Sequence, residues 1–369
     1  MTLNKDKCVV IAGGGTGGHL FPAIALGEEI TKIKTNLKIH YIGSIYGIEK
    51  NVLPKRNLTH TLLPITGLQR NLSFTSAYKN FLLPFRIIKS KNEIKKLFQS
   101  INPGLIIGTG GYASAIPLNE GVKRSIPIVI QEQNAFPGIT TRMFSSKAAK
   151  TFIAFKEAQK FINSKCILRG NPIRESINNG SREDGLKSFG LNTEKLTLLI
   201  FGGSQGSYFI NSIVKMAINE LIKLNIQIIW QTGPLHFNDF SNYECETVKV
   251  VPFIENMADA YAVSDLVIAR SGAITCSELT YCGKPSILFP FKAAAGDHQS
   301  KNAMALSRKG AALVLDEKKN NKNDLIDAIS NIILSNETLK KMKSSSQSMS
   351  SPNSAYKIAE EALSVMQNV

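Results

Sequence analysis

The stretch VVIAGGGTGGHLFPAIAL, Val9 to Leu26, joins three kinds of local sequence. Cys8 to Ala12 is a short apolar run with several β-branched residues, which predicts a buried strand. Gly13 to Gly18 predicts a turn, and apolar positions recur at helical spacing from Leu20 onward. A strand, a glycine turn and a helix N-terminus together offer bare backbone N–H groups to an anion. We therefore expect a ligand beyond the carboxyl end of this strand.

The glycines at 13, 15 and 18 also fit G-x-G-x-x-G, the dinucleotide fingerprint. That fingerprint requires an acidic residue about 20 positions further on, at the end of the second strand. Here the second expected strand, Lys38 to Ile42, is followed by Gly43 and Ser44 without a carboxylate. NAD is therefore disfavoured. A glycine turn that serves only close strand–helix packing remains an alternative.

Length and composition indicate a globular protein of two domains, since the chain has 369 residues, of which 43% are hydrophobic and 20% charged. The five cysteines form no C-x-x-C pair, which is typical of reduced thiols in a cytosolic protein. The first apolar run breaks into glycines, so we expect no signal peptide. No apolar stretch approaches the roughly 20 residues that a spanning helix needs.

The net charge of +16 favours an anionic partner, which could be a nucleic acid, a phosphorylated substrate or an anionic membrane. The alternative is a general bias of the sequence toward Lys, Asn, Ile and Ser. A nucleic-acid-binding protein is disfavoured because helix-turn-helix, zinc and RNP-like patterns are absent from the sequence.

Strand and helix patterns alternate along the chain, which predicts α/β architecture with parallel sheets. The second half restarts like the first: Leu196–Phe201 predicts a strand, Gly202–Gly206 a turn and Asn211–Leu224 a helix. The polar segment Asn178–Asn192 is the expected boundary. Near the end, Ser344–Ser354 predicts a serine-rich connector before a helix that docks on the first domain. The other expected strands are Leu105–Ile107, Ile126–Ile130, Thr151–Ala154, a last one near Cys166, Ile226–Gln231, Thr247–Val251, Asp265–Ala269, Ser286–Phe289 and Ala312–Leu315.

Polar motifs follow several of these strands. In ARSGAITCSELTYCGKP, Ala269 to Pro285, the loop and helix start suit a diphosphate, and Glu278 could accept both hydroxyls of a ribose. A solvated helix glutamate is the alternative. FKAAAGDHQSKNA, Phe291 to Ala303, offers amides and a carboxylate for sugar hydroxyls. In the first half, GTGGYAS and QEQNAFPG project toward the same site, with Gln133 and Asn134 in the second motif.

Metal-binding patterns are not found: the sequence has no H-E-x-x-H, no Cys/His cluster and no Asp-x-Asp. We therefore expect no metal and no other cofactor. Helix termini, backbone N–H groups and an arginine such as Arg174 in GNPIR would meet the charge of a nucleotide diphosphate.

The ordered set GGTGGH, GTGGYAS, QEQN, GNPIR, GGSQG, RSGAITCSE and DHQSKNA resembles the MurG family. The resemblance implies the GT-B fold: two Rossmann-like parallel-sheet domains facing across a cleft. It also implies an inverting transfer, without metal, of GlcNAc from UDP-GlcNAc to the MurNAc 4-hydroxyl of undecaprenyl-diphospho-MurNAc-pentapeptide. That reaction turns lipid I into lipid II in peptidoglycan synthesis. We expect an N-terminal domain, residues 1–170, that contacts the acceptor and the membrane. A C-terminal domain, residues 171–350, would bind UDP-GlcNAc, and residues 351–369 would form a C-terminal helix that packs back on the N-terminal domain.

The resemblance also assigns site residues. Ile254 would contact uracil through its backbone, and Gly110, Gly111 and Tyr112 would face the acceptor. His298 departs from the paired glutamines of some members, so its role stays open. The residues implied to contact UDP-GlcNAc are Thr16, Gly17, Gly18, Asn134, Arg174, Ser204, Ile254, Ala273, Ile274, Thr275, Cys276, Ser277, Glu278 and Gln299.

His19 is the candidate general base, since transfer to a hydroxyl requires removal of its proton. It begins the first helix, whose dipole favours the neutral imidazole that a base requires. The alternatives are that His19 only orients substrate, or that it is a helix-start histidine bonded to backbone.

The segment from Arg70 to Lys96 is rich in basic residues and in Phe, Leu and Ile. This composition predicts contact with an anionic cytoplasmic membrane surface. The alternative is ordinary helix core beneath a solvated basic face. With a lipid-linked acceptor, we expect a peripheral protein on the cytoplasmic face of the inner membrane, with protein partners left open. The residues expected at the membrane are Arg70, Phe74, Lys79, Leu82, Phe85, Arg86 and Lys89.

Competing enzymes with this fold are a diacylglycerol glycosyltransferase and a UDP-GlcNAc epimerase; GTGGYAS and QEQN argue against both. An NAD oxidoreductase is the remaining alternative.

Overall fold

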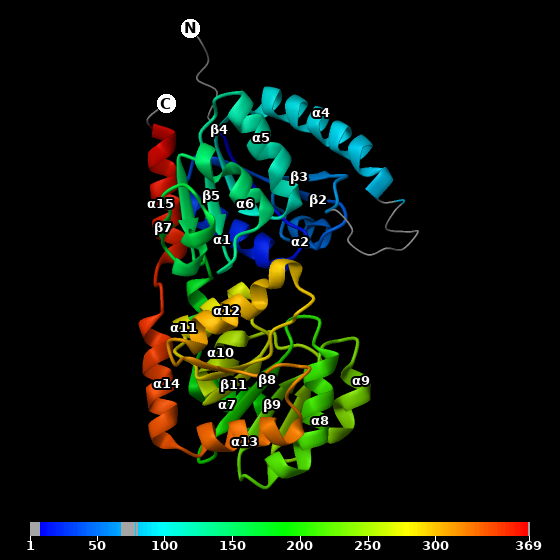
Figure 1. Ribbon diagram of the computed structural model, residues 1–369, viewed down its shortest axis with the longest axis vertical. Coiled ribbons are helices and arrows are strands. Elements are labelled where there is room, and N and C mark those ends of the chain that lie inside the picture. The colour runs from blue at the N-terminus through cyan, green and yellow to red at the C-terminus, as the bar shows by residue number, and fades with distance from the viewer. Residues whose placement is uncertain (1–7, 68–77, 79, 368–369) are drawn as a thin grey trace. The chain divides into compact units, whose positions relative to one another are not determined.

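The computed structural model describes residues 8–67, 78 and 80–367. The chain folds into two compact units. The first contains the described residues up to Ile173 together with those from Asn353 onward, and the second contains Arg174–Pro352. Each unit has its own parallel sheet with helices on both faces (Figure 1).

The first sheet is parallel throughout, in the order β3-β2-β1-β4-β5-β6-β7. Successive strands are added outward from β1 to β3, and the chain then returns to place β4 on the other side of β1. This reversal creates the crevice where ligands of doubly wound sheets bind. The strands are β1 (Cys8–Gly13), β2 (Lys38–Ser44), β3 (His60–Leu63), β4 (Pro103–Gly110), β5 (Ile128–Glu132), β6 (Lys150–Ile153) and β7 (Ile167–Leu168).

Alternating side chains of β1 enter two cores, because successive residues of a strand point to opposite faces. Val9 and Ile11 pack with α1 (Gly17–Ile33) and α15 (Ser354–Gln367). Val10 and Ala12 pack with the helices of the other face. The other helices among the described residues of this unit are α2 (Glu49–Lys55), α4 (Leu83–Ile101), α5 (Ala115–Lys123) and α6 (Ile139–Phe144), with short 3-10 turns at Tyr112–Ser114, Ser145–Lys147 and Lys156–Phe161.

The C-terminal helix α15 belongs to the first unit, although its sequence follows the whole second unit. Ile358, Ala359, Ala362 and Leu363 are buried in the core that α1 also lines. Lys150 and Arg169 form ion pairs with Glu361 of this helix. Its amphipathic spacing therefore serves tertiary packing on α1.

The second sheet is also parallel, in the order β10-β9-β8-β11-β12-β13, with its reversal between β8 and β11. Its strands are β8 (Thr197–Phe201), β9 (Gln227–Gln231), β10 (Val248–Val251), β11 (Leu266–Ala269), β12 (Ser286–Leu288) and β13 (Ala312–Val314). Its helices are α7 (Arg182–Phe189), α8 (Tyr208–Ile222), α9 (Phe237–Phe240), α10 (Met257–Val263), α11 (Ala273–Tyr281), α12 (His298–Ser307), α13 (Lys322–Ile333) and α14 (Asn336–Ser348), with 3-10 turns at Glu175–Asn178, Ser241–Tyr243 and Ala295–Asp297.

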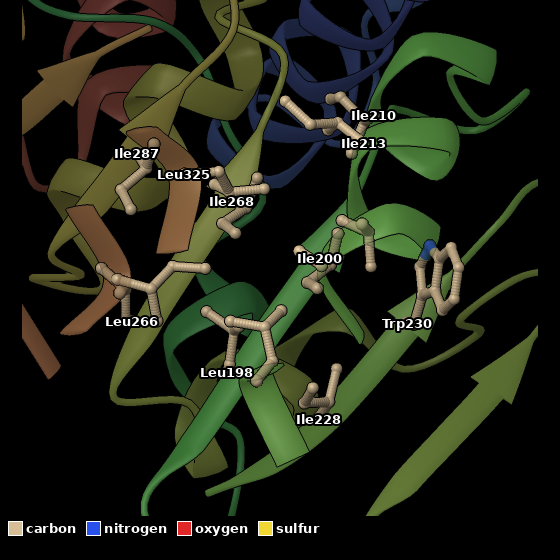
Figure 2. Close-up of a cluster of buried hydrophobic side chains, with 14 of the residues drawn as sticks. Leu198, Ile200, Ile210, Ile213, Ile228, Trp230, Leu266, Ile268, Ile287 and Leu325 are labelled. Atoms are coloured by element: carbon tan, nitrogen blue, oxygen red, sulfur yellow. The ribbon is translucent and has the colours of Figure 1, made fainter. Parts of the chain in front are cut away.

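The largest core of the second unit lies under α8 and α13 (Figure 2). Ile200 of β8 lies beside Trp230 in this core, and Ile268 of β11 belongs to the same core further along the sheet. The indole N–H of Trp230 donates to Asn211 Oδ1 at 3.0 Å, so this buried polar atom is satisfied. The core fixes the positions of the strand ends from which the site loops begin.

Three expectations from the sequence were wrong or incomplete. The two units divide between Ile173 and Arg174 and not within 178–192, because that segment contains α7, which packs on α10 in the second unit. The expected serine-rich connector is helical as far as Ser348, where α14 ends. The strand β3 was missed because it lies at the sheet edge, where His60–Leu63 is only partly buried and lacks a long apolar run.

Candidate functional site

In the first unit, the residues singled out from sequence gather at the carboxyl ends of β1, β4 and β5. Gly13 at the end of β1 lies opposite Gly110 at the end of β4 in the sheet register. Helix α1 starts at Gly17, directly after the glycine turn, so His19 lies in its first turn. The fold therefore brings the two glycine motifs of the first half together.

The first glycine turn is already occupied by a carboxylate of the protein itself. The N–H of Gly15 donates to Glu49 at 2.8 and 3.1 Å, and the N–H of Ser44 donates to the same carboxylate at 2.8 Å. Glu49 is fully buried. The expectation that this turn offers bare N–H groups to an anion is therefore wrong for Gly15, whose positive φ of 90° shapes the turn around Glu49.

His19 is half-buried, and its Nδ1 faces two oxygen atoms. The backbone carbonyl of Thr109 lies 3.0 Å from Nδ1, and Oε1 of Gln133 lies 2.9 Å away. The hydroxyl of Thr109 donates to the His19 carbonyl at 2.9 Å, which ties the first turn of α1 to β4. Gly110 is required beside this ring, because a Cβ there would lie 2.8 Å from Nδ1.

Tyr112, in the motif GTGGYAS, packs against the first glycine turn. A Cβ added at Gly15 would lie 3.2 Å from its ring, and a Cβ added at Gly67 would lie 2.9 Å from it. Burial raises the pKa of the Tyr112 hydroxyl, and the negative charge of Glu49 raises it further. Tyr112 therefore remains a neutral hydroxyl that packs on the glycine turn.

Asn134 is held by Glu132, a buried carboxylate that sequence reasoning missed. Glu132 accepts from the backbone N–H of Asn134 at 3.0 Å and from its side-chain amide at 3.2 Å. It also accepts from the N–H of Gly138 at 3.0 Å and from the Thr141 hydroxyl at 2.5 Å. The carboxylate in QEQN thus shapes the loop that presents Asn134.

In the second unit, Gln231 joins the glycine turn to the Ile254 loop. Its amide donates to the Gly203 carbonyl at 2.9 Å, and its Oε1 accepts from the Ile254 N–H at 2.8 Å. Ser204, next to Gly203, is exposed. Because the N–H of Ile254 already has a partner, a new backbone contact at this residue would use its carbonyl.

Glu278 lies half-buried on α11. Burial raises the pKa of its carboxyl to about 7, against the lowering effects of the Tyr261 hydroxyl and of the charge on Arg174. Tyr261 donates to Glu278 Oε2 at 3.1 Å. Tyr261 was missed because it lies on α10, outside every recognised motif. The structure thus brings Glu278 near Arg174, which is exposed.

Hydrogen bonds and an ion pair hold the residues directly before α11 in place. Ser271 donates through its hydroxyl to the Gln299 carbonyl at 2.9 Å, and Gln299 Oε1 accepts from the Phe291 N–H at 3.0 Å. Arg270 is bonded to Ser207 at 2.7 Å and pairs with Glu317. Within the stretch from Ala273 to Glu278, the Cys276 side chain is fully buried, so it faces the core and not a ligand.

The expected membrane segment is partly covered by the described residues. Leu82 is half-buried and Phe85 is exposed at the start of α4, and Lys89 is exposed one turn further on. The guanidinium of Arg86 stacks 5.0 Å from the Tyr46 ring, so this arginine also has an intramolecular role. The other three, Arg70, Phe74 and Lys79, lie outside the described residues.

Within the part of the chain that the structure describes, no helix is long and apolar enough to cross a membrane. The same residues contain no group of three or more His, Cys, Asp or Glu side chains suited to a metal ion.

Comparisons with known proteins agree with this architecture. Residues 9–153 match the glycosyltransferase family 28 N-terminal domain, and residues 197–361 match its C-terminal domain. A solved structure of MurG from Acinetobacter baumannii has a TM-score of 0.78 at 24% identity, over 98% of this chain and 100% of that one. The fold is therefore GT-B, as expected from the sequence.

Two curated relatives cover almost the whole chain. A protein from Chlorobaculum tepidum is 37% identical over 97% of this chain and 99% of its own length. A protein from Halalkalibacterium halodurans is 35% identical over 95% of this chain and 97% of its own length. Both are named UDP-N-acetylglucosamine–N-acetylmuramyl-(pentapeptide) pyrophosphoryl-undecaprenol N-acetylglucosamine transferase. The chain is therefore a glycosyltransferase of family 28 and belongs, within it, to the MurG family of N-acetylglucosamine transferases.

Proposed function

We propose that this chain transfers GlcNAc from UDP-GlcNAc to the 4-hydroxyl of MurNAc in undecaprenyl-diphospho-MurNAc-pentapeptide, with inversion at the transferred carbon. Donor and acceptor are those in the names of the curated relatives. The observation that carries the chemistry is the position of His19, whose Nδ1 faces the Thr109 carbonyl at 3.0 Å. Its other nitrogen, Nε2, is then the basic atom.

In the reaction, the acceptor oxygen forms a bond to C1 of GlcNAc while the bond from C1 to the β-phosphate oxygen breaks. The bonding pair leaves with UDP, and the hydroxyl proton goes to Nε2 of His19. A general base of this kind contributes about 10²–10⁴-fold to the rate. Gly110, Gly111 and Tyr112, which lie around the His19 ring or the adjoining glycine turn, would face the acceptor.

The second unit would hold most of the donor. Glu278 would accept hydroxyl groups of the ribose, and the hydrogen bond from the Tyr261 hydroxyl, which holds its Oε2, supports this role. The Ile254 carbonyl would meet the uracil edge, and the amide nitrogen of Gln299 would donate to the sugar because its Oε1 is bonded to Phe291. The N-terminal end of α11 and the exposed Arg174 would meet the diphosphate.

The remaining donor contacts would come from Ser204 in the second unit and, in the first, from Asn134 and the start of α1. Thr16 is exposed and in an extended conformation immediately before α1, and Gly17 and Gly18 form its first turn. Small residues at a helix start allow a ligand to approach the backbone closely.

A membrane contact through α4 is supported by large apolar side chains that are exposed and not buried in the core. Phe81, Phe85 and Ile88 are 70, 64 and 57% exposed, and their spacing places them along one side of the helix and its lead-in turn. Ile94 and Phe98 supply the core contacts of the same helix. Exposed lysines follow the apolar group: Lys89, Lys91, Lys95 and Lys96. This pattern suits an interfacial helix on an anionic cytoplasmic surface.

The decisive experiment incubates the protein with radiolabelled UDP-GlcNAc and three acceptors: a lipid I analogue, the same lipid diphosphate carrying a sugar other than MurNAc, and diacylglycerol. We expect label only in the lipid I product. Label in diacylglycerol, or isomerisation of UDP-GlcNAc without an acceptor, would contradict the proposal and favour one of the related enzymes.

A further inference from the structure

We propose that Gln133 is the positioning residue of His19: its side-chain oxygen, with the Thr109 carbonyl, keeps a proton on Nδ1 and leaves Nε2 as the basic nitrogen. This inference rests on the proposed function for its catalytic meaning, but its structural content can be tested without activity. The two residues are 114 positions apart in sequence: His19 lies in the first turn of α1, and Gln133 directly follows β5.

The first step concerns the proton on His19. Both atoms facing Nδ1, the Thr109 carbonyl oxygen at 3.0 Å and Gln133 Oε1 at 2.9 Å, can only accept a hydrogen bond. Nδ1 must therefore donate. A neutral imidazole with its proton on Nδ1 carries the lone pair on Nε2.

The second step concerns the orientation of the Gln133 amide. Its nitrogen lies 2.7 Å from the Thr109 carbonyl and 3.1 Å from the Gln131 carbonyl, and it also contacts Gln131 Oε1. Three acceptors surround this end of the amide. The reverse orientation would place Oε1 against three oxygens, so the hydrogen-bond network itself directs Oε1 to His19.

The third step concerns what holds Gln131. Its amide donates to Asn171 Oδ1 at 3.0 Å, and the amide of Asn171 donates to the Gln133 carbonyl at 3.1 Å. Gln131, Gln133 and Asn171 are each at most 2% exposed. A buried and satisfied network of this kind specifies one arrangement, because any broken link leaves a polar atom desolvated.

The fourth step concerns charge. The neighbouring carboxylates are directed elsewhere: Glu49 is bonded to Gly15 and Ser44, and Glu132 to the loop from Asn134 to Thr141. Tyr112 on the adjoining loop is kept neutral. In the described residues, neutral amide and carbonyl dipoles therefore stabilise the imidazolium that forms during transfer.

The test uses the full chain with ¹⁵N-labelled histidine. The His19 signals are assigned by their loss in His19→Ala, and ring-nitrogen shifts report which nitrogen carries the proton. We expect the wild type to carry it on Nδ1. Gln133→Met, which keeps the length but removes the acceptor, should shift the population toward Nε2–H. It should also lower kcat by about tenfold or more, within the range of a general base, with an unchanged KM for UDP-GlcNAc.

The matched control is Gln227→Met in the second unit. Gln227 is likewise buried, and its amide donates to the Asn192 carbonyl at 2.9 Å and to the Thr197 hydroxyl at 2.9 Å. This variant should lose thermal stability without changing the His19 signals or kcat. A comparable fall in kcat in both variants would show a general effect of removing buried amides and would overturn the inference.

If Gln133→Met fails to fold, Gln133→Asn keeps the amide but withdraws it from Nδ1 by one methylene, and it should likewise shift the population toward Nε2–H and lower kcat. A wild-type His19 protonated on Nε2, or an unchanged tautomer in folded Gln133→Met or Gln133→Asn, would each overturn the inference. By contrast, wild-type kcat in His19→Ala would overturn the role of His19 as base and leave the tautomer result standing.

Discussion

The affinity for UDP-GlcNAc should depend on pH through Glu278. Burial raises the pKa of this carboxyl to about 7, so it changes charge near neutrality. Ribose hydroxyls donate more strongly to a carboxylate than to a neutral carboxyl, since hydrogen bonds to charged groups are the stronger ones. The affinity should therefore be high above pH 7 and fall as the pH drops through 7.

The size of the effect follows from the ionised fraction. With a pKa of about 7, the carboxylate is populated to roughly a tenth at pH 6 and roughly nine tenths at pH 8. If only the ionised form binds the ribose, Kd should be about tenfold higher at pH 6 than at pH 8. This difference corresponds to a loss of about 1.4 kcal/mol in binding free energy.

Isothermal titration calorimetry with UDP-GlcNAc and no acceptor at pH 6, 7 and 8 measures this dependence directly. UDP-GlcNAc suits the assay because its diphosphate is a diester that stays fully ionised over this range. Glu278→Gln should bind more weakly at pH 8 and show no slope. Tyr261→Phe removes the hydrogen bond that lowers the pKa of Glu278, so the midpoint should move above pH 7.

Two results would refute this reasoning. A wild-type affinity that is flat from pH 6 to 8 would separate Glu278 from the ribose. An equal slope in wild type and Glu278→Gln would assign the pH dependence to another group.

His19→Ala should lower kcat by roughly 10²–10⁴ while calorimetric UDP-GlcNAc affinity stays nearly intact, and an effect confined to KM would make His19 a binding residue. Transfer should survive EDTA, because the sequence lacks an Asp-x-Asp pattern; complete loss that Mg²⁺ restores would show that a metal neutralises the diphosphate. Sedimentation with anionic vesicles at low salt should weaken when the α4 lysines become glutamine, since each basic residue near such a surface is worth about 1 kcal/mol, whereas transfer to a short-chain soluble acceptor should be largely spared. Unchanged sedimentation would place the membrane contact elsewhere; the residues to exchange are Lys89, Lys91, Lys95 and Lys96.

The central strands of the two parallel sheets, and the strand ends from which the candidate site loops begin, could be predicted from local sequence patterns. Apolar runs such as Val9–Ala12 and Leu198–Phe201 are buried on both faces of their sheets, so their local pattern is sufficient to predict a central strand. Glycine turns follow both runs directly. Seven motifs in one order then identified the family, because each is a contiguous stretch that needs no tertiary information to recognise.

Which polar groups meet could be recognised only in the folded chain. Gly15 and Glu49 are 34 positions apart in sequence and belong to different segments, so no local pattern indicates that a carboxylate fills the first glycine turn. The contact between His19 and Gln133 likewise depends on the order of β1, β4 and β5 in the sheet. Periodicity encodes which face of an element is buried, but hydrogen-bond partners depend on sheet order and on how far each loop extends beyond its strand. The carboxylate that fills the turn and the amide that contacts His19 therefore became visible only in the folded chain.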